Sequence, residues 1–110
     1  MHEVAIMEEA VRLAVEAAGA RRVHKLSLRV GVLSGVVPDA LRFAFDVVGK
    51  GTAVEGATLE IESVPAACWC AACGEEFESR DLMDECPRCH NLSGDLRRGR
   101  ELEIASVEIA

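Results

Sequence analysis

Two cysteine pairs of the form Cys-x-x-Cys constrain this chain more than any other feature. The first pair is Cys70 and Cys73, and the second pair, Cys86 and Cys89, begins 13 positions after Cys73. A Cys-x-x-Cys turn places two thiolates on one side of a tight knuckle, and two knuckles can close a tetrahedron around one Zn²⁺. We therefore predict that these four cysteines bind zinc. Because they fill every position of the tetrahedron, the predicted site is structural or regulatory, without an open position for catalysis.

Residues beside the two pairs leave alternatives open. Cys68 is either a partly buried thiol or an exchange ligand or redox-sensitive thiol. His90 directly follows Cys89 and is either a solvated turn residue or an alternative metal ligand. A dithiol redox protein is the rival interpretation of the pairs, although two pairs spaced to meet favour metal. Gly74 is expected to be left-handed, because a knuckle needs a small residue in that conformation.

The composition excludes several classes of protein. The chain has 110 residues and a formal net charge of −7, which disfavours binding to nucleic acid. No apolar run approaches the roughly 20 residues of a membrane span, and the N-terminus lacks the features of a secretory signal. We therefore expect a cytoplasmic protein without a membrane partner, in which cysteines are metal ligands before they are disulfides. No catalytic motif is present, so an enzyme is not expected.

Hydrophobic periodicity predicts helices and strands on both sides of the cysteines. Helical spacing covers residues 4–19, with one apolar face, and a second helix begins at Pro38 and ends at Gly49 or Gly51. No Ser, Thr, Asp or Asn stands at the start of the first helix, so its first turn is expected to fray. Alternating patterns predict strands over residues 23–33, 57–64 and 101–109. The apolar positions expected to be buried on the first helix and the first strand are Val4, Met7, Ala10, Val11, Ala14, Ala18, Leu26, Leu28, Val30 and Val32.

This order of elements predicts an α+β fold. It consists of a small mixed three-stranded sheet with two helices, plus an inserted zinc-knuckle lobe that resembles a four-cysteine zinc ribbon. We predict that residues 1–65 with 99–110 form the helix-and-sheet domain and that residues 66–98 form the inserted zinc-binding domain. The inserted segment is poor in aliphatic residues, so it is expected to depend on its metal.

The first three residues can form a second metal site. A free α-amine at Met1, the next backbone nitrogen and the His2 imidazole can chelate one metal in a near-planar arrangement, which suits Ni(II) or Cu(II). Glu3 can add a nitrogen from its backbone or an oxygen from its carboxylate. The alternative is an ordinary chain end with a solvated histidine.

Several stretches together resemble a known family, the HypA hydrogenase-maturation nickel chaperones. Besides the Cys-x-x-Cys pairs, they are Met1-His2-Glu3 leading into a helix, RVGVLSGVVPDALRFAFD from Arg29 to Asp46, GATLEIE from Gly56 to Glu62 and ELEIASVE from Glu101 to Glu108. The resemblance covers essentially the whole chain. One departure is Ala5, where the family usually has a serine that could cap the first helix.

The resemblance implies a nickel metallochaperone that is not an enzyme. It implies Ni(II) carried by Met1, His2 and Glu3, with structural or regulatory Zn(II) on Cys70, Cys73, Cys86 and Cys89. The implied partners are the nickel-handling GTPase HypB and the large subunit of [NiFe]-hydrogenase, and in some relatives urease accessory proteins. We expect a monomer or a weak homodimer. The alternative is a zinc-ribbon module for protein or nucleic-acid interaction, without a nickel role.

Overall fold

The computed structural model describes residues 2–110 and divides into two compact units. The helical unit comprises the described residues up to Arg29, with Gly35–Glu62 and Glu103–Ala110. The cysteine unit comprises Val30–Ser34 and Ser63–Leu102. The domain boundaries predicted from the sequence remain a prediction, since compact packing does not test independent folding. Within residues 2–110, no helix has the length and apolar character needed to cross a membrane.

Two helices pack against each other in the helical unit, α1 over Glu3–Ala18 and α2 over Pro38–Val48. Both helices follow the predicted spacing, and Pro38 begins α2, where its missing N–H costs nothing. The predicted faces are largely confirmed, except that Val4 is 41% exposed. The buried positions are Met7, Ala10, Val11, Ala14 and Ala18 on α1, and Leu41, Ala44 and Phe45 on α2.

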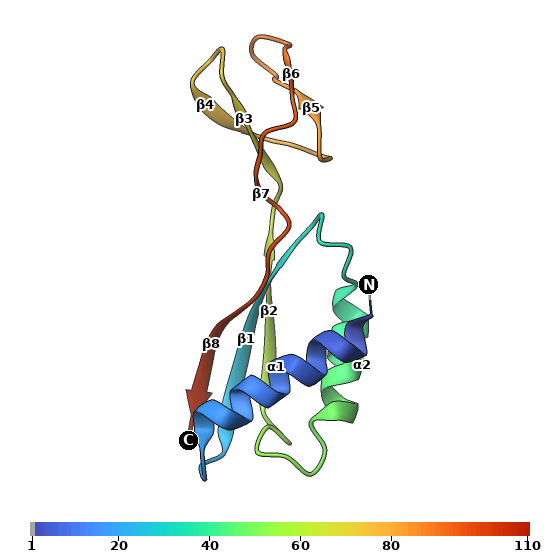
Figure 1. Cartoon of the computed structure of the whole chain (residues 1–110), viewed down its shortest axis with the longest axis vertical. Helices are drawn as coiled ribbons and strands as arrows, with labels where there is room; N and C mark the ends of the chain where they lie inside the picture. The colour runs from blue at the N-terminus through green and yellow to red at the C-terminus, as the bar shows by residue number, and fades with distance from the viewer. Residues whose placement is uncertain (1) are drawn as a thin grey trace. The chain divides into compact units, whose positions relative to one another are not determined.

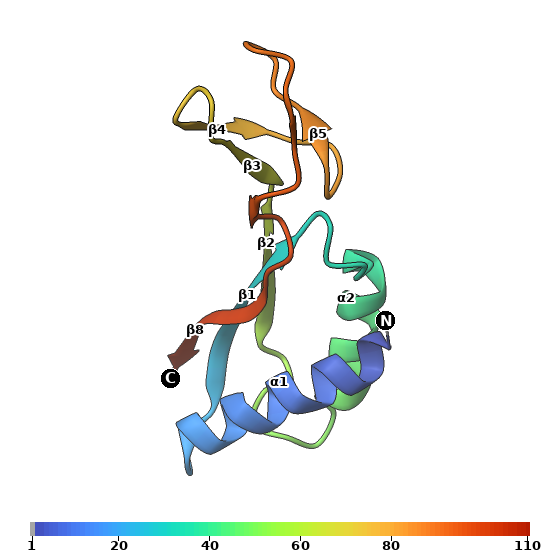
Figure 2. The ribbon, with the colours of Figure 1, turned by 45° about the horizontal axis from the view of Figure 1, so that its top comes forward.

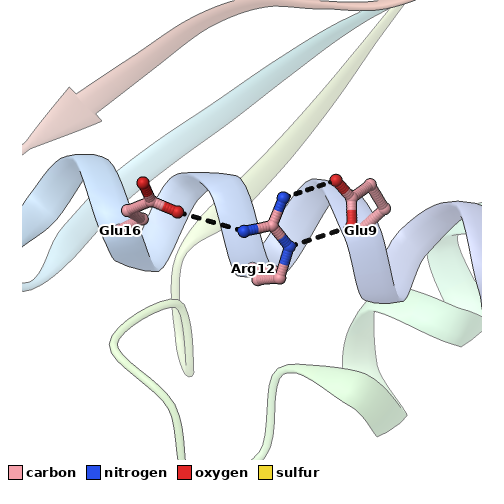
Figure 3. A network of polar contacts seen from close by, with 3 residues as sticks. All are labelled: Glu9, Arg12 and Glu16. Carbon is pink, nitrogen blue, oxygen red and sulfur yellow. Dashed lines mark hydrogen bonds and ion pairs between the residues drawn. The ribbon is translucent and has the colours of Figure 1, made fainter.

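The opposite side of α1 carries an exposed charge network (Figure 3). The guanidinium of Arg12 donates to both oxygens of Glu9, at 2.6 and 2.9 Å, and to Glu16 at 3.1 Å. These residues lie one helical turn apart, which is the spacing at which helix side chains meet. The Arg12 hydrogen bonds lower the pKa of the Glu9 carboxyl. Charge on one side and apolar side chains on the other fix which face of α1 turns inward.

The three-stranded sheet has the order β2-β1-β8, so β1 is the central strand. These strands span Val23–Gly31 (β1), Thr58–Val64 (β2) and Leu102–Ile109 (β8). In Figure 1, α1 crosses in front of this sheet. Because β1 ends at Gly31, Val32 lies beyond it and is 56% exposed, so the prediction that Val32 is buried was wrong.

Two cations on one face of β1 join it to both edge strands. Lys25 and Arg29 are each shared between an acid on β2 and an acid on β8. The ion pairs are Lys25–Glu60 at 2.9 Å, Lys25–Glu108 at 3.9 Å, Arg29–Glu62 at 3.4 Å and Arg29–Glu103 at 3.2 Å. From Lys25 to Arg29, the paired acid on β2 changes from Glu60 to Glu62 and the paired acid on β8 changes from Glu108 to Glu103. Strand β2 therefore runs parallel to β1 and strand β8 runs antiparallel to it. The prediction of a small mixed sheet is confirmed.

The cysteine unit is built from five short strands, drawn from olive to red in Figure 2. Strand β3 pairs antiparallel with β4 on one side and with β7 on the other, and β5 pairs antiparallel with β6. The bounds are Ala67–Cys70 (β3), Glu75–Glu78 (β4), Asp84–Glu85 (β5), Leu92–Ser93 (β6) and Leu96–Arg98 (β7). The core of this unit is small and rich in sulfur. It consists of Cys68, Cys70, Phe77 and Cys86, with Cys73, Cys89 and Leu96 packed against them.

Two glycines allow three chain segments of the cysteine unit to lie in contact. The N–H of Gly31 donates to Glu101 O at 2.7 Å, and the N–H of Leu33 donates to Gly99 O at 2.7 Å. A methyl group on Gly31 would lie 2.1 Å from the carbonyl oxygen of Gly99. Gly99 has a φ of +121°, and a methyl group on it would lie 2.8 Å from Cα of Ala66. Larger residues at either position would therefore push these segments apart.

Candidate metal sites

The four paired cysteines form one group in the cysteine unit. One sulfur from each of Cys70, Cys73, Cys86 and Cys89 lies within 4.8 Å of the others. The Sγ atoms of Cys70 and Cys89 are 3.4 Å apart, and those of Cys73 and Cys86 are 4.0 Å apart. A tetrahedral Zn²⁺ with bonds of about 2.3 Å to sulfur needs neighbouring sulfurs about 3.8 Å apart. The two distances bracket this value, so the residues fit such an ion, and the group is a four-cysteine metal-binding cluster.

Each Cys-x-x-Cys pair lies in or beside the turn of a β-hairpin. The first turn joins β3 to β4 and the second joins β5 to β6. In the first, the N–H of Gly74 donates to Cys70 O at 2.8 Å, and in the second, the N–H of His90 donates to Cys86 O at 2.9 Å. Gly74 and His90 have almost the same φ, 68° and 66°. The two knuckles therefore share the same backbone turn, and the prediction that Gly74 is left-handed is confirmed.

This shared turn predicts the effect of side chains at the two left-handed positions. Gly74→Ala should lower the free energy of unfolding of the cysteine unit by about 1 kcal/mol, because the left-handed conformation is unfavourable for a residue with a Cβ. No atom lies within 4 Å of the added methyl group, so the effect isolates the backbone conformation. Denaturant unfolding followed by the fluorescence of Trp69 on β3 measures it. His90→Gly is the matched control and should not destabilise the unit; a loss equal to that of Gly74→Ala would contradict this explanation.

The thiols of the cluster are held in unlike environments. Backbone N–H groups of Cys89 and Arg88 point at the sulfur of Cys86 and lower its pKa to about 7. Contact with the thiol of Cys89, together with burial, raises the pKa of Cys73 to about 12. Four crowded thiols cannot all ionise on their own, whereas a divalent cation among them favours the thiolate form of each. The donor set therefore suits a resident metal better than a free dithiol.

Cys68 and His90, which the sequence left with alternative roles, both lie outside the metal-binding group. Cys68 has no exposed surface and lies in the core, outside the group of four sulfurs, so it is more buried than predicted. His90 is exposed, and its Nδ1 lies 2.8 Å from Glu85 Oε1. Arg88 and Glu75 form an exposed ion pair that joins the two knuckles. Neither Cys68 nor His90 belongs to the metal-binding group within residues 2–110.

The predicted N-terminal site involves residues of α1. Met1 lies outside the described residues. His2 is the exposed N-cap of α1, and its Nδ1 accepts a hydrogen bond from the N–H of Ala5 at 3.3 Å. The prediction that the first turn lacks a capping side chain was therefore wrong, because an imidazole nitrogen can accept the bond that Ser or Asp usually accepts.

Glu3 connects the start of α1 to the start of α2. Its Oε2 accepts a hydrogen bond from the N–H of Val37 at 3.1 Å. Val37 is the N-cap residue of α2 and has no capping bond from its own side chain. The N–H groups of Val37 and of Glu3 itself lower the pKa of the Glu3 carboxyl. No sequence signal links residues 34 positions apart in this way, so this role of Glu3 was missed.

Comparison with known proteins connects this arrangement to an established family. The family model described as HypA, hydrogenase/urease nickel incorporation metallochaperone, matches residues 1–109. A hydrogenase maturation factor HypA from Picosynechococcus sp. is 48% identical over 112 aligned positions, covering 99% of each chain. Another from Geobacter metallireducens is 41% identical over 109 positions, again covering 99% of each.

Solved structures show the same fold. The solution structure of the Ni metallochaperone HypA from Helicobacter pylori superposes with a TM-score of 0.66 at 22% identity, covering 99% of this chain and 97% of that one. A second solution structure, of a HypA protein, gives a TM-score of 0.72 at 21% identity and covers 100% and 97%. With the whole-length family match, these findings lead to one conclusion. The chain belongs to the HypA family of hydrogenase/urease nickel-incorporation metallochaperones, which are maturation factors and not enzymes.

Proposed function

We propose that this protein binds Ni(II) at its N-terminus and delivers it to the large subunit of [NiFe]-hydrogenase. The donors are the α-amine of Met1, the His2 imidazole and a group of Glu3. The observation that carries the proposal is the exposed His2 side chain beside the first residue, in a chain matched over residues 1–109 by a nickel-incorporation family. Amine and imidazole nitrogens suit the tetragonal geometry that Ni(II) favours.

The cysteine cluster is better suited to a resident Zn²⁺ than to the cargo. Its four sulfurs lie within 4.8 Å of one another, which suits a tetrahedral ion, and two of the cysteines, Cys70 and Cys86, are buried. A metal that must pass to a partner needs a site that can open by ligand exchange, and the exposed side chain of His2 provides such a ligand. We therefore assign Zn(II) to Cys70, Cys73, Cys86 and Cys89, in a structural or regulatory role.

Delivery requires partners, and we propose two. The nickel-handling GTPase HypB supplies or exchanges the metal, and the hydrogenase large subunit receives it. The family description, which names both hydrogenase and urease, supports a role in nickel incorporation. We propose that this delivery takes place in the cytoplasm.

Replacement of His2 tests the nickel site. We expect His2→Ala to weaken Ni(II) binding by about 100-fold or more, since even residues that only orient a metal ligand cost roughly 10- to 100-fold when mutated. Isothermal titration of the zinc-loaded chain with Ni(II) measures the affinity. A residue added before Met1 should also weaken binding, because it displaces the α-amine from the chelate.

The matched control is His24→Ala, which removes another exposed imidazole at the start of β1. It should bind nickel as the unmodified chain does. Equal affinity in His2→Ala and His24→Ala would refute the N-terminal site.

A further inference from the structure

The first turn of α1 depends on His2 for its capping bond. His2 has extended backbone angles, φ −93° and ψ 96°, and its Nδ1 accepts the N–H of Ala5. Its carbonyl oxygen accepts the N–H of Ile6 at 3.2 Å. The first N–H groups of a helix have no partner within the helix, so the imidazole satisfies a donor that would otherwise bond to water.

The same ring nitrogen is the one that an N-terminal chelate uses. When a metal binds the backbone nitrogen of His2, Nδ1 closes a compact ring through Cγ, Cβ and Cα, whereas Nε2 lies on the far side of the imidazole. A ring nitrogen that accepts a hydrogen bond does so through its single lone pair, which is also the pair that binds metal. One lone pair cannot serve the N–H of Ala5 and a metal ion together.

We propose that Ni(II) and the N-cap of α1 compete for Nδ1 of His2, so that loading the metal removes the cap. This inference rests on the proposed nickel site. The apo protein then holds His2 in a capped conformation, and nickel binding releases the first-turn N–H of Ala5 to water. Breaking the capping bond reduces the free energy gained on nickel binding. Its re-formation favours release of nickel to a partner.

Glu3 limits how far this change spreads. Its carboxylate is bonded to the N–H of Val37 at the start of α2. That bond does not involve His2, so it can persist while the cap is lost. We expect the side chain of Glu3 to stay with α2 and the change to remain within the first turn of α1.

Amide hydrogen exchange of the zinc-loaded full chain tests the inference directly. Adding Ni(II) should raise the exchange rate of the Ala5 amide by about fivefold, the factor that corresponds to a typical capping bond. The Val37 amide should keep its protection. If nickel binds in a His2-dependent way but the Ala5 amide is unchanged, the competition is refuted and the nickel site stands. If His2→Ala leaves nickel affinity unchanged, the proposed site and the competition both fail.

A variant of Ala5 provides a second test. Ala5→Pro removes the N–H that Nδ1 accepts, and proline is tolerated in the first turn of a helix. Ala5 is exposed, so the ring meets no packed neighbour there. Nickel should bind about fivefold more tightly, because no cap has to be broken. Ala5→Val keeps the N–H, adds no capping group and is close to proline in size, so it is the matched control. Affinity in Ala5→Pro no higher than in Ala5→Val would overturn the inference.

Discussion

Replacing Cys70 by alanine is expected to remove the bound metal and unfold the cysteine unit while α1 and α2 stay folded. The core of this unit is mostly thiol groups, with Phe77 and Leu96 as its larger apolar members. So little apolar area cannot offset the entropy of ordering the unit, whereas structural zinc contributes on the order of 10 kcal/mol. Two spectroscopic probes report on the units separately. Tryptophan emission reports on the cysteine unit, because Trp69 is the single tryptophan and lies on β3. The helical circular dichroism signal reports on the helical unit, because both helices belong to it.

The measurement is metal content together with tryptophan emission and far-ultraviolet circular dichroism. Cys70→Ala should lose its metal on dialysis and shift the Trp69 emission towards that of an exposed indole, with the helical signal retained. Cys68→Ala is the matched control, since Cys68 is also buried on β3 but lies outside the group of four sulfurs. It should keep its metal. Loss of the helical signal in Cys70→Ala would show that the two units do not fold separately.

Replacing Gly31 by alanine should lower the free energy of unfolding of the cysteine unit by about 3 kcal/mol. The added methyl group would overlap backbone atoms of Gly99, which cannot move aside as a flexible side-chain tip can. Relief of the overlap requires separating β1 from the segment after β7. That separation breaks the hydrogen bonds that Gly31 and Leu33 make across it. Denaturant unfolding of the metal-loaded chain, followed by Trp69 fluorescence, measures the loss.

Gly94→Ala is the matched control for this change. Gly94 lies in the same unit, and its added methyl group would meet only the end of the Met83 side chain, at 3.3 Å. A flexible side chain can yield by a few tenths of an ångström, so the effect should stay within about 0.5 kcal/mol. Similar losses in Gly31→Ala and Gly94→Ala would mean that the contact with Gly99 is not the cause.

The helices and long strands were predictable because their signals are local. Met7, Ala10, Val11 and Ala14 repeat at helical spacing, and each is buried on α1. Pro38 marks the start of α2 by its fixed φ, and alternation marks β1 and β2. The cysteine spacing identified the four residues that the fold brings together, because each Cys-x-x-Cys turn presents two sulfurs on one side and the two turns can face each other.

What escaped prediction depends on contacts between distant residues or on elements too short to show a period. Strands β5 and β6 have two residues each, and their pairing follows from the knuckle between them. The approach of Gly31 to Gly99, and the bond from Val37 to Glu3, join residues far apart in the chain. His2 was missed as a cap because histidine is outside the usual capping set, and because the predicted helix began at residue 4 whereas α1 begins at Glu3.

A sulfur-rich core ties the folded population of the cysteine unit to its metal supply. With Zn²⁺ as the ligand of the folded form alone, mass action adds stability in proportion to the logarithm of the free zinc concentration, about 1.4 kcal/mol per tenfold change. Aliphatic cores have no such dependence. With Zn²⁺ in the cluster, as we propose, the folded population of the unit follows the free zinc concentration, and any partner that recognises its folded surface responds to zinc availability independently of nickel.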